Sequence, residues 1–514
     1  MSTYTSFNPR TGVPGTASFS DAASEAVGTA VSAASNAFAS LRSFPSARVA
    51  ELLRAVADEL DALGSTVVAV ADRETGLGET RLTGELARTT GQFRLFADLC
   101  AEGSYVEAVI DHARPELAPP RPDLRRMLVP LGPVAVFGAS NFPLAFSVPG
   151  GDTASALAAR CPVVVKAHPA HPETSQLCAE AIVRGLTRAG APSGSFALLH
   201  GRANSVGEAL VTAPGIKAVG FTGSLRGGRA LYDLASRRDE PIPVYAEMGS
   251  VNPFFATAAA LAARLDSIAD GFVGSMTQGG GQFCTKPGLA FVPATEDGRR
   301  WAALVASKIS ETAGACLLSA QIRDTLAGQI ERTSKLPGVT VLAGGGAAPS
   351  SAGFDYPATV LAVDSATFRA TPELASEHFG PFGLIVHCDS PQEFSAMARD
   401  LHGNLTATIH AEAADAESVR PLVEELRDKV GRLIWNGYPT GVAVTHAMVH
   451  GGPYPASTLA LHTSVGTAAI KRFLRPVAYQ SYPAELLPPE LQEGNPLGIM
   501  RLVDGAWTDR AEGR

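Results

Sequence analysis

The chain has 514 residues, about three times a typical domain length, so we expect at least two domains with separate cores. Hydrophobic residues make up 46% and charged residues 18%, a composition that excludes a disordered chain. The formal net charge is -8 and the sequence pI is about 5.8, so the chain has no basic field to attract nucleic acid or anionic lipid.

Cysteine spacing and hydropathy bear on location and metal content. The six cysteines form no CxxC pairs, which predicts reduced thiols and no zinc site or disulfide framework. The first residues lack the basic and apolar regions of a secretory signal. The longest nearly apolar run, residues 127–139, is shorter than the ~20 residues that cross a bilayer. We therefore expect a cytoplasmic protein without a membrane span or a metal.

Helical spacing dominates the first hundred residues. From about residue 20 to residue 100 the chain is rich in Ala and Leu, and apolar residues such as Val49, Leu53 and Val56 recur on one helical face. Residues 111–130 are instead rich in Pro and Arg, which cannot sustain a helix. We expect extended chain and a domain boundary there.

From Gly132 onwards, short apolar runs alternate with Ala-rich helical patterns. This alternation predicts βαβ units and a parallel sheet covered by helices. A second α/β region begins near Asn252 and ends near Pro439, and the chain is again rich in Pro after about Arg475. The predicted elements of the first region are Val134–Phe137, 151–159, 163–165, 174–189, Phe196–Leu199 and Ala218–Thr222.

Three residues are candidates for covalent chemistry. Cys284 lies in GGGQFCTKPG, where exposed backbone N–H groups or the nearby Lys286 would lower the thiol pKa. Glu247 follows a strand-like stretch, so its carboxylate could activate water in a cleft. Asn141 follows the run Val134–Phe137, where its amide could donate to an oxyanion. Taken singly, each has a commoner explanation as a buried thiol, a solvated carboxylate or a turn amide.

Two segments could hold a phosphate or a ribose. FTGSLRGG places Gly223 five residues before Gly228, directly after a predicted strand, where a helix amino terminus would receive a phosphate. The pattern matches neither the GxGxxG fingerprint nor the P-loop. Lys166 ends another predicted strand and could meet the same ligand, although a solvated lysine is the commoner reading.

These segments occur in an order that resembles the aldehyde dehydrogenase superfamily along nearly the whole chain. Longer stretches, such as FGASNFPLAFSVPGGDTASALAA, are similar to the branch that contains α-ketoglutaric semialdehyde (2,5-dioxopentanoate) dehydrogenases and NADP⁺-dependent fatty aldehyde dehydrogenases. The shared motifs are FNPRTG near the start, SNFP at 140–143, VVVK at Val163–Lys166, FTGS at 221–224, AEMGSVNP around Glu247, GQFC ending at Cys284 and EHFGP at 377–381.

The resemblance implies an α/β fold with a Rossmann-type cofactor domain, an α/β catalytic domain and a small bridging element. We expect the cofactor domain over residues 1–110 and 131–249 and the catalytic domain over residues 250–474. The bridging element would comprise residues 111–130 and 475–514. Because segment 111–130 resembles the family's element that joins subunits, a homodimer or homotetramer is implied.

The resemblance also implies a reaction. Cys284 would attack the aldehyde carbon, and the Asn141 amide and the Cys284 N–H would hold the oxyanion. After hydride transfer to the nicotinamide, Glu247 would activate the water that hydrolyses the thioester. The residues expected to contact the cofactor are Lys166, His168, Arg202, Gly223, Ser224, Gly228, Glu377 and Phe379.

One departure bears on the choice of cofactor. Many NAD⁺-using relatives have a glutamate two residues after the lysine, and this chain has His168 there. Without that carboxylate a 2′-phosphate is not repelled, and Arg202 is placed to pair with it. We therefore expect NADP⁺, with NAD⁺ as the alternative.

The substrate is the least determined feature. A semialdehyde with a distal carboxylate needs a cation or backbone donors, for which Arg160 and Arg475 are candidates, whereas a fatty aldehyde needs a long apolar channel. We expect oxidation of α-ketoglutaric semialdehyde to α-ketoglutarate. A fatty aldehyde is the alternative substrate, and a cofactor-free cysteine esterase or acyl-transfer hydrolase is the alternative of another class. Motif spacing predicts that one wall of the substrate pocket is formed by Phe146, Pro149, Phe283 and Thr285. Residues 435–439 would form the opposite wall.

Overall fold

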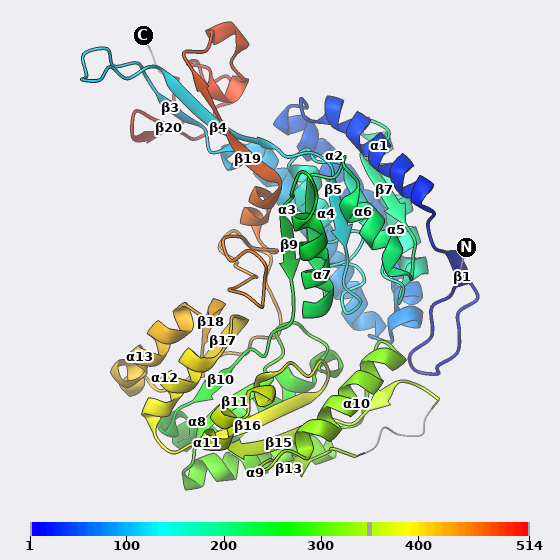
Figure 1. Ribbon diagram of the computed structural model, residues 1–514, viewed down its shortest axis with the longest axis vertical. Coiled ribbons are helices and arrows are strands. Elements are labelled where there is room, and N and C mark those ends of the chain that lie inside the picture. Colours follow the sequence, from blue (N-terminus) through cyan, green and yellow to red (C-terminus); the bar gives the residue numbers. More distant parts are fainter. Residues whose placement is uncertain (1–2, 347–351, 512–514) are drawn as a thin grey trace.

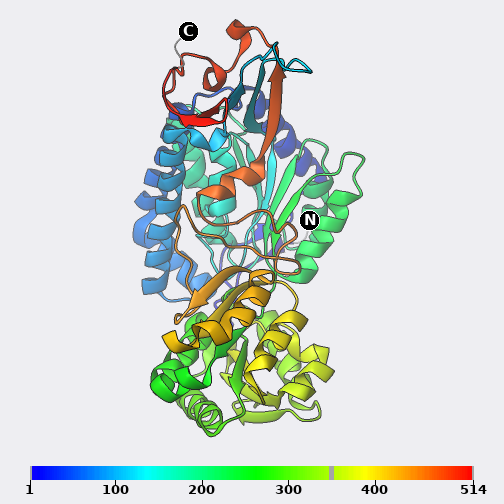
Figure 2. The ribbon, with the colours of Figure 1, turned by 90° about the vertical axis from the view of Figure 1, so that its left-hand side faces the viewer.

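The structure is a computed structural model that describes residues 3–346 and 352–511. Two helix-covered sheets lie one beyond the other along the long axis, and a third sheet protrudes from the end that carries the first (Figure 1). The same three parts are separate in the perpendicular view (Figure 2). The α/β class predicted from the alternating pattern is confirmed.

Five parallel strands form the first sheet, in the spatial order β7-β6-β5-β8-β9. Their apolar runs are nearly continuous because helices cover both faces. The order reverses at β5, the kind of switch point beside which α/β sheets bind ligands. The strands and connecting helices are β5 (Val134–Phe137), α4 (Gly151–Ala158), β6 (Val163–Lys166), α5 (Pro172–Arg188), β7 (Phe196–Leu199), α6 (Asn204–Thr212), β8 (Ala218–Thr222), α7 (Leu225–Ser236) and β9 (Val244–Glu247).

The predicted helical opening region is confirmed as three helices, α1 (Ser24–Leu41), α2 (Ser46–Thr75) and α3 (Glu79–Glu102). Residues Val49, Leu53 and Val56, which the periodicity placed on one face, are buried in the core that α2 shares with the first sheet. The helix α3 is held beside the loop that follows β5, because its Glu85 carboxylate accepts hydrogen bonds from backbone N–H groups of that loop.

The second sheet has seven strands in the order β13-β15-β16-β11-β10-β17-β18, and only β13 is antiparallel to its neighbour. Its core comprises two apolar layers, one on each face. Its elements are β10 (Phe254–Ala256), α8 (Ala258–Thr277), β11 (Leu289–Pro293), α9 (Glu296–Glu311), α10 (Ala320–Ser334), β13 (Thr340–Ala343), β15 (Thr359–Asp364), α11 (Ser365–Ala370), β16 (Phe382–Cys388), α12 (Pro391–Asp400), β17 (Asn404–His410), α13 (Ala416–Arg427) and β18 (Val430–Trp435).

The protruding sheet joins the Pro- and Arg-rich segment to the carboxy-terminal region. β4 (Leu124–Pro130) pairs antiparallel with β19 (Leu474–Gln480) along its whole length. β3 (Val109–Asp111), β20 (Arg501–Val503) and β21 (Ala506–Thr508) complete the sheet in the order β19-β4-β3-β20-β21. Two small pairs lie elsewhere, namely β1 (Thr3–Tyr4) with β2 (Phe19–Ser20) and β12 (Ala315–Cys316) with β14 (Asp355–Tyr356).

The chain between β18 and β19 leaves the second sheet and returns to the first. Met248 donates its backbone N–H to Ala456 O at 2.8 Å, and Ser457 forms an isolated bridge with Glu247. Further on, Arg472 forms a buried ion pair with Asp152 of α4 at 2.7 Å. The range 250–474, expected as the catalytic domain, therefore includes a segment that lies along β9.

Short 3₁₀ helices occur at the turns: η1 (Ser104–Val106), η2 (Gln278–Gly281), η3 (Pro372–Ala375), η4 (Ala413–Asp415), η5 (Thr467–Phe473), η6 (Ala484–Leu486) and η7 (Pro489–Leu491). Among the described residues, no helix has the length and apolar character needed to cross a membrane.

Candidate active site

The candidate site forms where the two large sheets face each other. Asn141 and Glu247 come from the carboxyl ends of β5 and β9, whereas Cys284 and Glu377 precede β11 and β16. Because β10, β11 and β16 are parallel, the loops before them share one edge of the second sheet. The carboxyl edge of the first sheet therefore meets the amino edge of the second.

A strained glycine turn presents Cys284. Gly279, Gly280 and Gly281 of η2 have φ values of 58°, 69° and 65°, which favour glycine over residues with a Cβ. A Cβ on Gly281 would also collide with the backbone of Gly380. The three glycines thus bring the cysteine loop into close contact with the loop that carries Glu377.

A buried amide then fixes the cysteine backbone. Asn252 Nδ2 donates to the carbonyl oxygens of Cys284 at 2.8 Å and Lys286 at 2.9 Å. Asn252 is held in turn because Asn404 Oδ1 accepts from its backbone N–H at 3.2 Å. The sequence analysis missed this role of Asn252. Asn252 adopts a left-handed φ of 47°, and its position two residues after a Gly-Ser turn could have indicated that conformation.

The predicted oxyanion donor lies beside this loop. Asn141 is buried, and its Nδ2 donates to Gln282 O at 2.8 Å. That bond uses one of the two amide N–H groups, so the other is available to a ligand. Arg81 of α3 donates to the Asn141 carbonyl at 2.6 Å and holds the residue from behind.

Cys284 and Glu247 are brought together, with a histidine between them. His450 Nε2 lies 3.4 Å from Cys284 Sγ and 2.9 Å from Glu247 Oε1. Ser464 Oγ donates to the other carboxylate oxygen, Oε2, at 2.5 Å. The His450 and Glu247 side chains are only 0% and 3% exposed. Sequence reasoning missed His450, because a lone histidine in VHGGPYP carries no motif of its own.

The charges in this cluster are set by burial. Burial raises the pKa of the Cys284 thiol well above its ordinary value, and the Glu247 carboxylate raises it further. Burial also opposes ionisation of Glu247, but His450 and the Ser464 hydrogen bond outweigh it, so the pKa of that carboxyl is lowered. The expectation of a lowered thiol pKa is therefore wrong for this state, and deprotonation requires a base.

The expected cation beside the thiol is also different. Lys286 Nζ donates to Phe382 O at 2.8 Å, and burial lowers its pKa to about 8. Burial raises the pKa of Glu377, which the nearby Lys286 and the N–H of Ser250 partly offset. The cation that lowers the pKa of Cys284 is Arg88 of α3.

The predicted phosphate site is open to solvent. Gly223 and Ser224 are exposed at the amino terminus of α7, and Ser224 Oγ accepts from Gly227 N as the helix cap. Free N–H groups at such a terminus suit a phosphate. Gly228 is buried, and a Cβ there would lie 2.6 Å from Met248 Sδ, so this glycine allows α7 to pack against β9.

Lys166, His168 and Arg202 lie at or just beyond the ends of β6 and β7. Burial lowers the pKa of Lys166 to about 8, with Asp21 opposing the shift. Burial, and then the neighbouring cationic groups, lower the pKa of His168 well below its ordinary value, so its ring is neutral. Arg202 has an exposed side chain, and its backbone N–H donates to Asp21 at 2.5 Å.

An aromatic cluster stands next to the thiol. Phe142 contacts Phe146 with ring centroids 5.3 Å apart and Phe283 at 5.1 Å. Phe146 also lies 6.0 Å from the His450 ring. Pro149 and Thr285, the other expected pocket residues, are buried, and Phe379 beyond Glu377 is half-buried.

The two arginines suggested for a distal carboxylate are engaged elsewhere. All three nitrogens of Arg160 already donate, to Phe44 O, Ser46 Oγ and Tyr105 OH. Arg475 is exposed on β19 in the protruding sheet. Neither suggestion fits the site, because the sequence placed both residues without their tertiary partners.

Two sheets that meet at a half-buried thiol, with an exposed helix terminus at the edge of the first, are typical of an α/β enzyme that combines a nucleophile with a dinucleotide. Residues 2–476 match the family model described as the aldehyde dehydrogenase family. The chain belongs to this family, whose members oxidise aldehydes with NAD(P)⁺. The match favours oxidation over the cofactor-free hydrolase.

Two relatives extend over almost the whole chain. The chain is 48% identical to alpha-ketoglutaric semialdehyde dehydrogenase 2 of Azospirillum brasilense, covering 98% of this chain and 96% of that protein. It is 44% identical to alpha-ketoglutaric semialdehyde dehydrogenase of Acinetobacter baylyi, covering 95% and 93%.

Solved structures show the same fold at lower identity. Thermus thermophilus 1-pyrroline-5-carboxylate dehydrogenase matches with a TM-score of 0.79 at 22% identity, over 93% of this chain and 90% of that chain. Staphylococcus aureus betaine aldehyde dehydrogenase matches with a TM-score of 0.80 at 20% identity, over 94% of each chain.

The pH dependence of Cys284 alkylation tests the electrostatics of the cluster. The thiolate is the reactive form, so alkylation by iodoacetamide should accelerate only as pH rises through the raised pKa. Glu247→Gln removes a negative charge that raises this pKa, so its rate profile should move to lower pH. Peptide mass spectrometry would follow Cys284 alone. Glu377→Gln, a weaker contributor, should give a smaller move, and an unchanged Glu247→Gln profile would contradict the account.

Proposed function

We propose that the protein oxidises α-ketoglutaric semialdehyde to α-ketoglutarate with NADP⁺. The observation that carries the chemistry is the contact of Cys284 Sγ with His450 Nε2, next to the Glu247 carboxylate and the Asn141 amide. The substrate is supported by the names of the two relatives that match nearly the full chain at 48% and 44% identity.

In the proposed reaction, His450 Nε2 takes the Cys284 proton as Sγ forms a bond to the aldehyde carbon. Glu247 Oε1, 2.9 Å away, stabilises the resulting imidazolium. The carbonyl oxygen becomes an oxyanion, which accepts from the second Asn141 N–H and from the Cys284 backbone N–H. This arrangement resolves the raised thiol pKa, because the proton leaves only as the carbon–sulfur bond forms.

The nicotinamide, when bound, accepts the hydride that converts the adduct into a thioester. We assign the pyrophosphate to Gly223 and Ser224 at the exposed α7 terminus, and Glu377 to the nicotinamide ribose. Phe379 would lie beside the nicotinamide ring, and Gly228 supports the site by packing. Glu247 then acts as the base for water, which attacks the thioester carbon and releases Cys284 with the acid.

The preference for NADP⁺ rests on charge at the ends of β6 and β7. Lys166 and Arg202 are basic, and His168 is neutral, so no carboxylate occupies the position that would repel a 2′-phosphate. One acidic side chain, Asp21, acts on Lys166 and accepts a hydrogen bond from the backbone N–H of Arg202. We therefore assign Lys166, His168 and Arg202 to the adenosine end of NADP⁺.

The proposed domains correspond to the three large sheets. We propose that the first sheet carries the cofactor and the second sheet presents the cysteine, while the protruding sheet bridges subunits. We also propose a cytoplasmic location, supported by six free cysteines.

A homodimer or homotetramer is supported by the edge strand β18. Leu433 and Trp435 are exposed on it, at 40% and 47%. The opposite edge, β13, contains a register shift between Val341 and Ala343, a device that discourages pairing with another chain. An open edge with exposed apolar side chains suits a partner subunit.

An assay that follows NADP⁺ reduction tests the proposed aldehyde oxidation. The wild type should reduce NADP⁺ with α-ketoglutaric semialdehyde at a kcat/KM at least about tenfold above that with decanal. Cys284→Ala should lower the rate at least about 1000-fold, because no thioester can form. Cys316→Ala, which removes another partly exposed thiol, should retain activity. Preference for decanal would favour the fatty aldehyde alternative, and acid release without nicotinamide reduction would favour the hydrolase.

The cofactor assignment predicts a selective effect at Arg202. Arg202→Ala should raise KM for NADP⁺ about tenfold, because a charge-assisted contact to the 2′-phosphate is lost. NAD⁺ lacks that phosphate, so its KM should change little and provides the internal control. Equal changes for the two cofactors would contradict the assignment.

The assembly is tested by charging the open edge. Leu433→Arg should shift the protein to a smaller species in sedimentation velocity, because a charge cannot be buried unpaired at the interface. Val341→Arg makes the same change at the opposite edge, where Val341 is 43% exposed, and should leave the mass unchanged. A monomeric wild type would contradict the proposal.

A further inference from the structure

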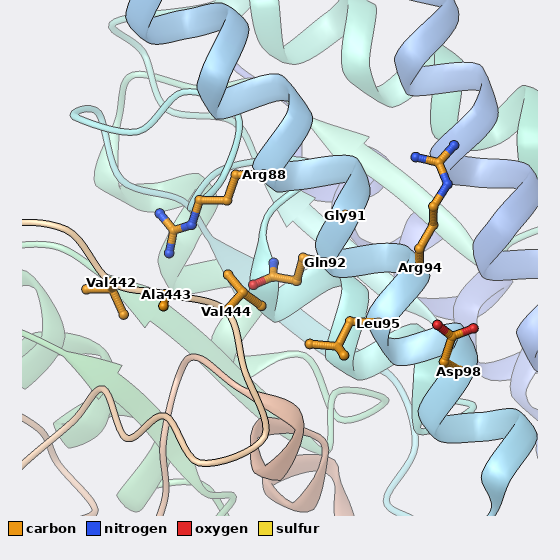
Figure 3. A pocket seen from close by; sticks show the side chains of 9 residues that line it. All are labelled: Arg88, Gly91, Gln92, Arg94, Leu95, Asp98, Val442, Ala443 and Val444. Carbon is orange, nitrogen blue, oxygen red and sulfur yellow. The ribbon is translucent and has the colours of Figure 1, made fainter.

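A groove with a volume of about 520 Å³ lies between α3 and the segment that follows β18. Arg88, Gly91 and Gln92 line one side, and Val442 to Val444 line the other. Figure 3 shows the Arg88 guanidinium directed away from the rest of α3, towards Val442 and Ala443. Arg94 and Asp98 also line the groove, and Arg88 is the charged group that faces the apolar segment.

Arg88 also reaches the aromatic cluster beside the nucleophile. Its guanidinium carbon lies 4.9 Å from the Phe146 ring centroid and 5.9 Å from that of Phe142. Phe146 is the ring that stands 6.0 Å from His450. Burial lowers the pKa of Arg88, and the charges of Glu85, Cys284 and Glu247 partly offset this shift. Arg88 therefore links the groove to the reacting thiol.

The guanidinium of Arg88 contacts the Phe142 and Phe146 rings but no polar group of the described residues. Among residues 3–346 and 352–511, Arg88 makes no hydrogen bond or ion pair, and its Nε is buried without an acceptor. Its helix neighbour Glu85 uses one carboxylate oxygen to accept the N–H groups of Leu144 and Ala145 at 2.9 Å. A half-buried guanidinium remains charged, so an unfilled set of donors is costly unless a ligand occupies it.

The other arginines near the site are already engaged. Arg81 donates to Asn141 O at 2.6 Å. Arg432, which also interacts electrostatically with Cys284, donates to Pro439 O at 2.6 Å and Gly441 O at 3.1 Å. Arg94, on the rim of the groove, pairs with Asp58 and Asp61. Arg88 is the arginine of this group that can give its full donor set to a ligand.

We propose that Arg88 is the specificity-determining residue of this enzyme and binds the carboxylate at the far end of an ω-oxo acid substrate. The inference rests on the proposed function and names the group that selects a carboxylate-bearing aldehyde over a neutral one. A planar guanidinium can hold a carboxylate through two parallel hydrogen bonds, which fixes the chain direction as well as its charge. The apolar methylenes of the substrate then lie against Phe142 and Phe146.

The test compares two aldehydes of equal chain length, α-ketoglutaric semialdehyde and pentanal, in variants at Arg88. Arg88→Gln should lower kcat/KM for the semialdehyde about 30- to 100-fold, mainly through KM, because a charged hydrogen-bonded contact is lost. Pentanal has no carboxylate, so it should lose only the activity that the higher Cys284 pKa removes, a smaller loss in kcat/KM that appears in kcat rather than in KM. Arg88→Lys should restore part of the preference, because it keeps the charge without the planar fork.

Arg94→Gln is the matched control, because it removes a cation from the same helix and groove rim that is already paired with protein carboxylates. It should leave the ratio of the two kcat/KM values unchanged. Equal losses for both aldehydes in Arg88→Gln would show a structural role and overturn the assignment, as would a retained preference for the semialdehyde. A wild type that prefers pentanal would overturn the proposed substrate together with the role of Arg88.

Discussion

The pairing of the segment after β18 with the end of β9 holds the site together. Through the Met248 N–H bond to Ala456 O and the bridge between Glu247 and Ser457, a stretch of irregular chain lies against the first sheet. The same stretch carries His450 and Ser464, the two side chains that contact the Glu247 carboxylate. Without this pairing, Glu247 would face Cys284 without the groups that keep it ionised.

That constraint explains the charge balance of the cluster. A half-buried thiol and a buried carboxylate disfavour each other's ionised forms, because each is poorly hydrated and each repels the other's negative charge. His450 relieves the conflict by lying between them, so that a proton can leave sulfur without a separated anion in an apolar site. Arg88 supplies a further positive charge from outside the cluster. In the proposed reaction, the Cys284 thiol is therefore deprotonated only as it attacks the aldehyde.

The sequence predicted the regular elements well, because their signals are local. Runs such as Val134–Phe137 and residues 163–165 are buried on both faces of a sheet, so their apolar residues are continuous and easily recognised. The strand β19 begins at Leu474, one residue from the boundary that the Pro-rich composition indicated. In the candidate site, Cys284, Glu247 and Asn141 were predicted because each lies in a recognisable motif.

The residues that were missed depend on contacts distant in the sequence. His450 lies 166 residues after Cys284, in a segment without helical or strand periodicity, and its role follows only from where that segment lies. Arg88 looks like one of many charged residues on an amphipathic helix until the loop after β18 encloses it. The thiol pKa was misjudged for the same reason, since burial by both sheets outweighs the local effect of a glycine turn.

The position of Arg88 couples substrate choice to nucleophile chemistry. A substrate carboxylate that approaches Cys284 also approaches the Glu247 carboxylate. Without a compensating cation, these two carboxylates would repel each other in a site of low dielectric. In the proposed assignment, Arg88 offsets that repulsion when the substrate enters. Once the carboxylate neutralises the guanidinium, the field that favours a free thiolate is weakened. In the proposed reaction, proton transfer to His450 then becomes the main route to the carbon–sulfur bond when the aldehyde carries a carboxylate.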